Sequence, residues 1–204
     1  MPRLRSPLER VCPTYDLPVG YMTVRITSMT REDKKSQVPP PIWHYTTRLH
    51  LPSILEEKKI RTEDPMFVLS QQLPVTWFSL NRVWEPTACK VNLPEEVGAT
   101  ILRDATAAAC GGLVRIGVDQ SDAPFRTHQL IKVARSDRST VKALIRCGLR
   151  CGANPEDWRF TPNEVPKDRW RTIQIWDEAS REWLPYQHEW RFHSRRDELV
   201  GSFG

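Results

Sequence analysis

The sequence predicts a mixed α+β fold with mostly antiparallel strands and a few short helices. β-prone segments with period-two alternation recur along the chain, and helical spacing is confined to two short segments. The chain also lacks the regular strand–helix–strand order of a doubly wound fold. With 204 residues, of which 39% are hydrophobic and 27% charged, it is long enough for one domain with a packed core.

The first 40 residues differ in composition from the rest. Seven prolines fall within residues 1–41, and residues 31–35 form a charged run. Only residues 21–27 alternate like a strand. We therefore expect a proline-rich, basic arm over residues 1–40 and a single domain over residues 41–204.

A strand followed by a helix opens the domain. Residues 42–46 are apolar and β-prone, and residues 48–60 carry leucine and isoleucine at helical spacing. Pro52 suits a first helical turn, while Lys58 and Lys59 suit the C-terminal end of the helix dipole. The pattern predicts one short helix that ends near residue 60.

The middle of the chain contains two further strands and one more helix. Residues 74–80 and 112–118 are rich in β-branched and aromatic side chains. Residues 139–147 place Val141, Leu144 and Ile145 on one helical face, and we expect Gly148 to end that helix.

The last quarter predicts three strands, over residues 170–176, 182–184 and 188–193. The polar turn at residues 177–180 connects the first two as a hairpin. Most strands therefore follow one another without intervening helices, which favours antiparallel pairing.

Several classes of protein lack support in this sequence. There is no phosphate-loop, dinucleotide-turn or nucleophile-elbow motif. Cys147 and Cys151 have no nearby histidine to complete a zinc site, so no metal is expected. The scattered cysteines suit reduced thiols, and no stretch reaches about 18 apolar residues; a cytoplasmic location without a membrane partner is the expectation.

Three motifs set polar side chains into apolar strands, where burial without a partner is costly. They are His44-Tyr45-Thr46, Trp77-Phe78-Ser79 and Glu189-Trp190-Arg191. Their order resembles the ADP-ribosyltransferase-like superfamily, in particular its His-Tyr-Glu branch, over about residues 42 to 193. The resemblance implies two small, mostly antiparallel sheets that form a cleft for NAD. It also implies transfer of ADP-ribose to a macromolecular acceptor, either protein or nucleic acid, with release of nicotinamide.

The resemblance also implies a role for each motif residue. His44 would bond the adenosine ribose, the backbone near Tyr45 would hold the nicotinamide amide, and Thr46 would supply a small hydroxyl beside them. Glu189 would be catalytic, since a carboxylate bonded to the ribose 2′-hydroxyl stabilises the positive charge that develops when the glycosidic bond breaks. The remaining assignments are a flat wall for nicotinamide from Trp77 or Phe78, a hydroxyl from Ser79, and a pyrophosphate contact from Arg191. Tyr45 is a second candidate for stacking on nicotinamide, and the sequence does not choose between them.

Structural roles are open for the same residues. His44 also fits a core histidine that bonds the backbone, and Glu189 also fits an ion-pair partner of Arg191. Trp77 and Phe78 point to opposite faces of one strand, so only one of them is expected to form the wall.

The sequence departs from the family pattern at two points. Residue 187 is Gln187, so the Glu-x-Glu pattern of arginine-modifying members is not met, and either Trp84 or Trp158 would replace a second tyrosine. Two other functions therefore stay open: an inactive nucleotide- or protein-binding module of the same fold, and a nucleic-acid-binding protein that uses arginine and tryptophan.

Overall fold

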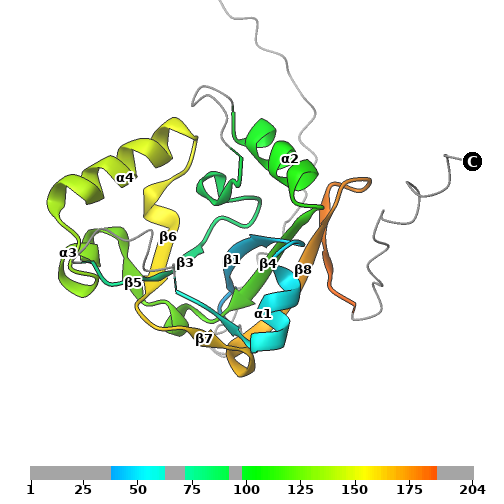
Figure 1. The fold of residues 1–204 in the computed structure, drawn as a ribbon, viewed down its shortest axis with the longest axis horizontal. Helices are drawn as coiled ribbons and strands as arrows, with labels where there is room; N and C mark the ends of the chain where they lie inside the picture. Colours follow the sequence, from blue (N-terminus) through cyan, green and yellow to red (C-terminus); the bar gives the residue numbers. More distant parts are fainter. Residues whose placement is uncertain (1–37, 63–71, 92–97, 188–204) are drawn as a thin grey trace, which may run out of the picture. The chain divides into compact units, whose positions relative to one another are not determined.

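The computed structural model describes residues 38–62, 72–91 and 98–187 (Figure 1). From Pro39 onward these residues belong to one compact unit. Residues 1–37 of the expected arm, with its strand at residues 21–27, and the last expected strand at residues 188–193 lie outside the described residues. The arm and its boundary stay predictions.

Seven strands form one antiparallel sheet in the order β5-β6-β3-β1-β4-β8-β9, and β2 pairs with β7 in a second sheet. The mixed α+β class with antiparallel strands is thus confirmed, although the strands divide as seven and two instead of into two small sheets. The strands are β1 (Ile42–Thr47), β2 (Lys59–Ile60), β3 (Thr76–Ser79), β4 (Leu113–Val118), β5 (Phe125–Arg126), β6 (Trp158–Thr161), β7 (Val165–Pro166), β8 (Trp170–Asp177) and β9 (Glu182–Pro185).

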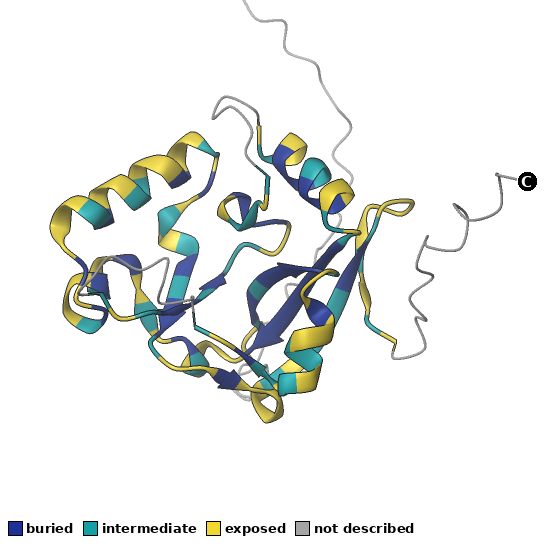
Figure 2. Cartoon of the chain, in the orientation of Figure 1, coloured by how far each residue is buried: buried dark blue, intermediate teal, exposed yellow. Residues whose placement is uncertain are grey.

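The described helices are short and have one buried and one exposed side (Figure 2). The α-helices are α1 (Leu51–Glu57), α2 (Ala99–Ala109), α3 (Leu130–Val133) and α4 (Arg138–Arg150). Single 3-10 turns are η2 (Pro86–Ala88), η3 (Gln120–Asp122), η4 (Thr127–Gln129), η5 (Pro155–Asp157) and η6 (Lys167–Arg169).

The large sheet opens between β1 and β3. Strand β1 pairs with β4 along its whole length, from Ile42 opposite Val118 to Thr47 opposite Leu113. With β3 it shares a single register pair, Trp43 opposite Ser79. The sheet therefore has two parts, β5-β6-β3 and β1-β4-β8-β9, joined by little backbone pairing.

Both faces of the β1-β4-β8 part are covered by apolar side chains. Val114 packs with Leu51 of α1 on one face, while its neighbour Leu113 packs with Ala107 of α2 on the other. All six residues of β4 are buried. On the β3-β6 part, α3 and α4 pack through Leu130 and Val141.

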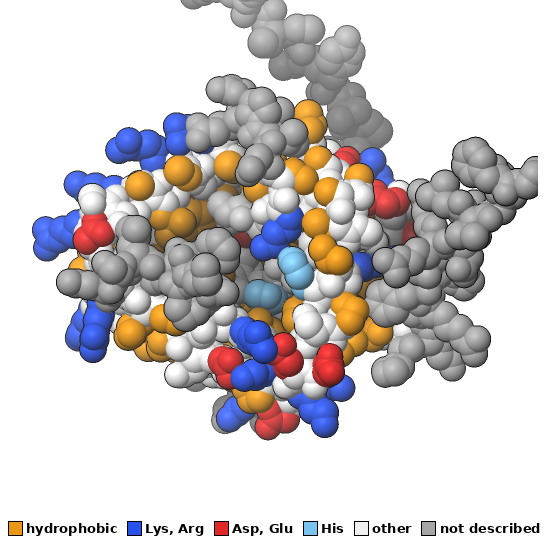
Figure 3. All heavy atoms as spheres, in the orientation of Figure 1, with side chains coloured by type: hydrophobic (Ala, Val, Ile, Leu, Met, Phe, Trp, Pro, Cys, Tyr) orange, Lys and Arg blue, Asp and Glu red, His pale blue; other side chains and the backbone are white. Residues whose placement is uncertain are grey.

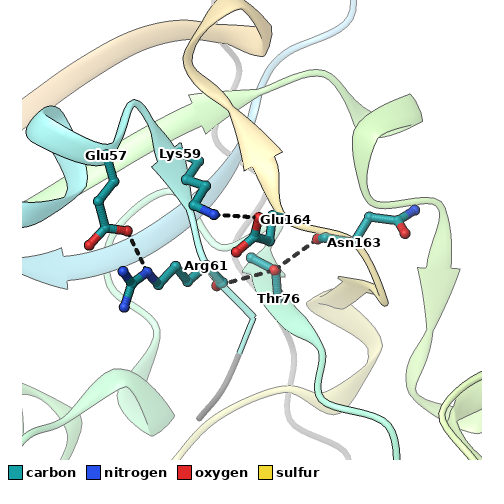
Figure 4. Close-up of polar contacts among 6 residues, drawn as sticks. All are labelled: Glu57, Lys59, Arg61, Thr76, Asn163 and Glu164. Atoms are coloured by element: carbon teal, nitrogen blue, oxygen red, sulfur yellow. Dashed lines mark hydrogen bonds and ion pairs between the residues drawn. The ribbon is translucent and has the colours of Figure 1, made fainter. Parts of the chain in front are cut away.

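The two-stranded sheet is attached to β3 through Thr76 (Figure 4). The Thr76 hydroxyl lies 3.3 Å from the carbonyl oxygen of Arg61 and 3.0 Å from that of Asn163, to which it donates. Lys59 of β2 forms a 2.7 Å ion pair with Glu164, next to β7. These contacts fix the start of β3, directly before Trp77.

The helix ends differ from the expectations. Helix α1 stops at Glu57 because Lys58 has a left-handed backbone (φ 55°), and Lys59 lies in β2 instead of in the helix. Helix α4 continues to Arg150, so Gly148 does not end it. The absence of a side chain at Gly148 instead leaves room for the indole of Trp158, since a Cβ there would overlap ring atoms Cη2 and Cζ2.

We predict that Gly148→Ala destabilises the protein in spite of the higher helix propensity of alanine. Overpacking against Trp158 costs about 1–3 kcal/mol, and the gain in propensity offsets about 1 kcal/mol of it. Thermal or urea unfolding measures the difference. Leu149→Ala, at an exposed position of the same helix, is the control and should change the unfolding free energy by less than about 0.5 kcal/mol. An equal or higher stability of Gly148→Ala would contradict the packing argument.

Candidate functional site

A cavity of about 280 Å³ lies where β1 and β3 part. Its volume is at the small end of cavities that bind small molecules. Strands β1 and β3, the loop after β3, helix α4 and strand β6 all contribute to its wall. The lining residues are Trp43, His44, Tyr45, Trp77, Phe78, Ser79, Glu85, Thr87, Ala88, Lys90, Leu144 and Trp158.

The cavity brings together five of the eight residues singled out in the sequence: His44, Tyr45, Trp77, Phe78 and Ser79. Thr46 is buried in β1 opposite Val114 and is not among the lining residues. Glu189 and Arg191 lie outside the described residues.

Both Trp77 and Phe78 line the cavity, and which of them would form the wall for nicotinamide stays a prediction. In a closed sheet, neighbouring side chains on a strand point to opposite faces. Here the cavity follows the open edge of β3, and it therefore reaches side chains on both faces. Phe78 is also part of the core with Ile42 and Ile116, whereas Trp77 packs beside Phe160.

His44 bridges the opening between the two strands. Its Nδ1 lies 2.9 Å from the carbonyl oxygen of Trp77. Burial, together with the charge of Lys90, lowers its pKa from 6.5 to about 4, so the ring is neutral at pH 7. Because a carbonyl oxygen only accepts, Nδ1 carries the proton, and Nε2 is left as a hydrogen-bond acceptor. The structure thus provides the backbone partner of a core histidine and a ring that lines the cavity.

Tyr45 is held as a fixed part of the wall. Its hydroxyl donates to the carbonyl oxygen of Asn81 at 2.5 Å, and its ring meets Trp84 edge-on. Burial raises the pKa of the phenol, although the nearby Arg115 acts in the opposite direction. The phenol therefore stays protonated, and its proton is donated to the backbone of Asn81 and not to a ligand.

Glu85 is a buried carboxylate that the sequence analysis did not single out. Its oxygens accept hydrogen bonds from the Ser79 hydroxyl at 2.7 Å, the Thr87 hydroxyl at 2.8 Å and the Trp158 indole at 3.1 Å. It forms no ion pair with another residue in the described part of the chain. The only sequence signal was its place between Trp84 and Pro86, in a loop that approaches β3 only after folding.

Trp158 lines the cavity beside Trp77, from the neighbouring strand β6. The two rings meet edge-on, with centroids 6.3 Å apart. Of the two tryptophans left open as replacements for a second tyrosine, Trp158 lines the cavity, and Trp84 packs behind Tyr45 in the core. The indole of Trp158 is fixed by Glu85 on one side and by the bare backbone of Gly148 on the other.

The positive charge at the cavity comes from Lys90. It is the sole lysine or arginine among the lining residues that the structure describes. Partial burial, with the charge of Lys90, lowers the pKa of His50, so neutral imidazole is favoured there as well. Histidine side chains lie beside Lys or Arg side chains near the centre of the face in Figure 3. The lining thus carries one cation, Lys90, and one carboxylate, Glu85, and its aromatic walls suit a flat ligand whose negatively charged group lies near Lys90.

The remaining chemistry of the described residues is limited. They contain no group of three or more His, Cys, Asp or Glu side chains that could hold a metal ion. Within the same ranges, no helix has the length and apolar character needed to cross a membrane. Comparison with protein-family models, curated proteins and solved structures finds no match for this chain.

We predict a pH-dependent contribution of His44 to stability. Between pH 6.5 and 4 the unfolded state binds the proton and the folded state does not, so the unfolding free energy falls as the pH is lowered through this window. This difference in pKa corresponds to about 3 kcal/mol of unfolding free energy. The full amount is present above pH 6.5 and is lost near pH 4. In His44→Asn, whose amide can still donate to Trp77, this component disappears. Urea unfolding of both proteins at several pH values measures it, and parallel pH profiles would contradict the assignment.

We predict that Glu85→Gln destabilises the protein by about 1–3 kcal/mol, because one acceptor oxygen is replaced by a donor that faces other donors. Glu164→Gln is the matched control, since its ion pair with Lys59 is exposed and contributes about 1 kcal/mol or less. Urea unfolding compares the two. If both variants lose the same small amount, Glu85 does not organise the wall.

Proposed function

We propose that this protein binds NAD in the cavity between β1 and β3 and transfers ADP-ribose to a macromolecular acceptor. The observation that carries the proposal is the convergence of two motifs 30 residues apart. His44 and Tyr45 from β1 line the same cavity as Trp77, Phe78 and Ser79 from β3. The resemblance to ADP-ribosyltransferases assigns these residues to NAD.

The chemistry of the wall supports this ligand. The rings of Trp77 and Trp158 provide flat apolar surface for a heteroaromatic base. A neutral His44 offers an acceptor nitrogen, which suits a ribose hydroxyl as donor. Lys90 offers a positive charge for a phosphate. The volume of about 280 Å³ suits part of a dinucleotide, with the remainder outside the cavity.

In the proposed reaction the bond between the nicotinamide nitrogen and the ribose C1′ breaks. Nicotinamide leaves with the electron pair, and positive charge develops on the ribose. A nucleophile of the acceptor then forms the new bond to C1′ and gives up its proton. The role proposed for Glu189 is to bond the 2′-hydroxyl and stabilise the developing charge.

We predict that NAD raises the melting temperature of the protein, because a ligand that binds the folded state stabilises it by mass action. Glu189→Gln should lower the rate of nicotinamide release about a hundredfold or more with little change in NAD affinity, since its carboxylate acts on the transition state. Melting curves, NAD titration and release of labelled nicotinamide measure the three quantities. Glu182→Gln, at an exposed position of β9, is the control and should behave like the wild type.

The outcomes separate the candidate functions. Binding without turnover in the wild type would favour the inactive binding module. No shift in melting temperature at millimolar NAD would contradict the proposal. Wild-type turnover of Glu189→Gln would exclude Glu189 as the catalytic residue, and a joint loss of stability, affinity and rate would favour the ion pair with Arg191.

A further inference from the structure

Helix α4 carries a row of basic side chains on its outer side. Arg138, Lys142, Arg146 and Arg150 recur at every fourth position and are exposed. At a rise of about 1.5 Å per residue, the row extends over about 18 Å. Side chains four apart are neighbours on a helix surface, so the four charges form one continuous row that turns gradually around the outer side.

Most of the row is not explained by the stability of the helix, although Arg150 in the last turn suits the helix dipole. Arg138, Lys142 and Arg146 form no ion pair with another residue of the described ranges. Like charges four apart repel one another, and a cation at the first helical position opposes the helix dipole. The helix is held instead by its inner side, where Val141, Leu144 and Ile145 pack on the core.

The residues around the row are also mainly positively charged. Residues 130–151 contain six lysines and arginines and one acidic residue, Asp137. The Asp137 carboxylate accepts hydrogen bonds from Thr140 and from the Ser139 hydroxyl at the helix start, so it caps the helix. Figure 3 shows Lys and Arg side chains gathered along the edge over α3 and α4. The result is an elongated cationic surface with little compensating charge.

We propose that the outer side of α4 binds the phosphate backbone of double-stranded DNA. A row of about 18 Å is longer than a single pyrophosphate and matches a polymer of regularly spaced negative charges. The α4 sequence contains no aromatic residue, whereas single-stranded nucleic acid is held largely by stacking on aromatic rings. An α-helix also fits the major groove of B-form DNA and not the deep, narrow groove of duplex RNA. Contacts of this kind are independent of base sequence.

This surface goes beyond the proposed NAD chemistry, because its binding needs no NAD. Leu144, on the inner side of the same helix, lines the cavity. A duplex on the outer side would therefore lie about one helix diameter, roughly 10 Å, from the cavity wall.

The test is fluorescence anisotropy of the full-length protein with a labelled 20-base-pair duplex, without NAD, between 50 and 200 mM salt. The row variant is Arg138→Gln with Lys142→Gln and Arg146→Gln; glutamine keeps helix propensity close to that of lysine and arginine. The matched control removes three exposed charges elsewhere, by Lys167→Gln, Arg169→Gln and Arg181→Gln. A single Lys142→Gln variant is included in case the triple variant does not fold.

For the wild type we expect the logarithm of the binding constant to fall linearly with the logarithm of the salt concentration. The row variant should bind at least about tenfold more weakly at 50 mM salt, with a slope shallower by about 2–3, and Lys142→Gln should reduce the slope by about 1. The control should keep the slope of the wild type to within about 1. No binding by the wild type at 50 mM salt, an equal loss in row variant and control, or tighter binding of a single strand or of polyglutamate than of the duplex would each overturn the proposal.

Discussion

The candidate site depends on the near-absence of backbone pairing between β1 and β3. A fully paired ladder here would bring the two strands together along their length and leave no space between them. Only Trp43 and Ser79 face each other in register. At the next residue of β1, the imidazole of His44 donates a hydrogen bond to the carbonyl oxygen of Trp77 in place of a backbone hydrogen bond between the strands. The side chain that lines the cavity thus also satisfies a backbone group that the opening would leave without a strand partner.

An opening in a sheet is stable only if other contacts hold the strands on either side of it in place. In this chain a short series of contacts does so: Glu85 accepts from Ser79 on β3 and from Trp158 on β6, and Trp158 rests on Gly148 of α4. A buried carboxylate is costly unless its oxygens are fully bonded. Because several donors converge on Glu85, this side chain fixes the loop and both strands relative to one another, and Trp158 extends the contact to α4. On the other wall, Arg115 lies between the rings of Trp43 and Trp183 and supports β1 in a similar way.

The sequence predicts the elements that have a clear local period and misses those defined by tertiary contacts. Strands β1, β3, β4 and β8 were predicted within one or two residues, because alternating β-branched and aromatic residues specify a half-buried strand. Helix α2 was missed since its buried side includes Arg103 and Thr106, which hide the apolar period. Strand β6 was also missed, although Trp158 and Phe160 alternate with Arg159 and Thr161 over its four residues. Gly148 was misread because a glycine that ends a helix and one that admits a neighbouring ring look alike in sequence.

For the site, too, the sequence revealed residues on strands with a local pattern and missed residues placed by tertiary contacts. Motif residues on strands were found because their polar character contrasts with the apolar run around them, whereas Glu85 and Lys90 come from a loop whose position only the fold determines. Lys90 supplies one positive charge, and His44 is neutral at pH 7. The Glu85 carboxylate in the same lining offsets this charge, so the described wall provides no net positive charge for a pyrophosphate, which is negative on each phosphate. Further cations are needed to compensate the ligand in a partly buried site. The residue that the resemblance assigns to this task is Arg191, whose planar fork suits bidentate contact with phosphate oxygens.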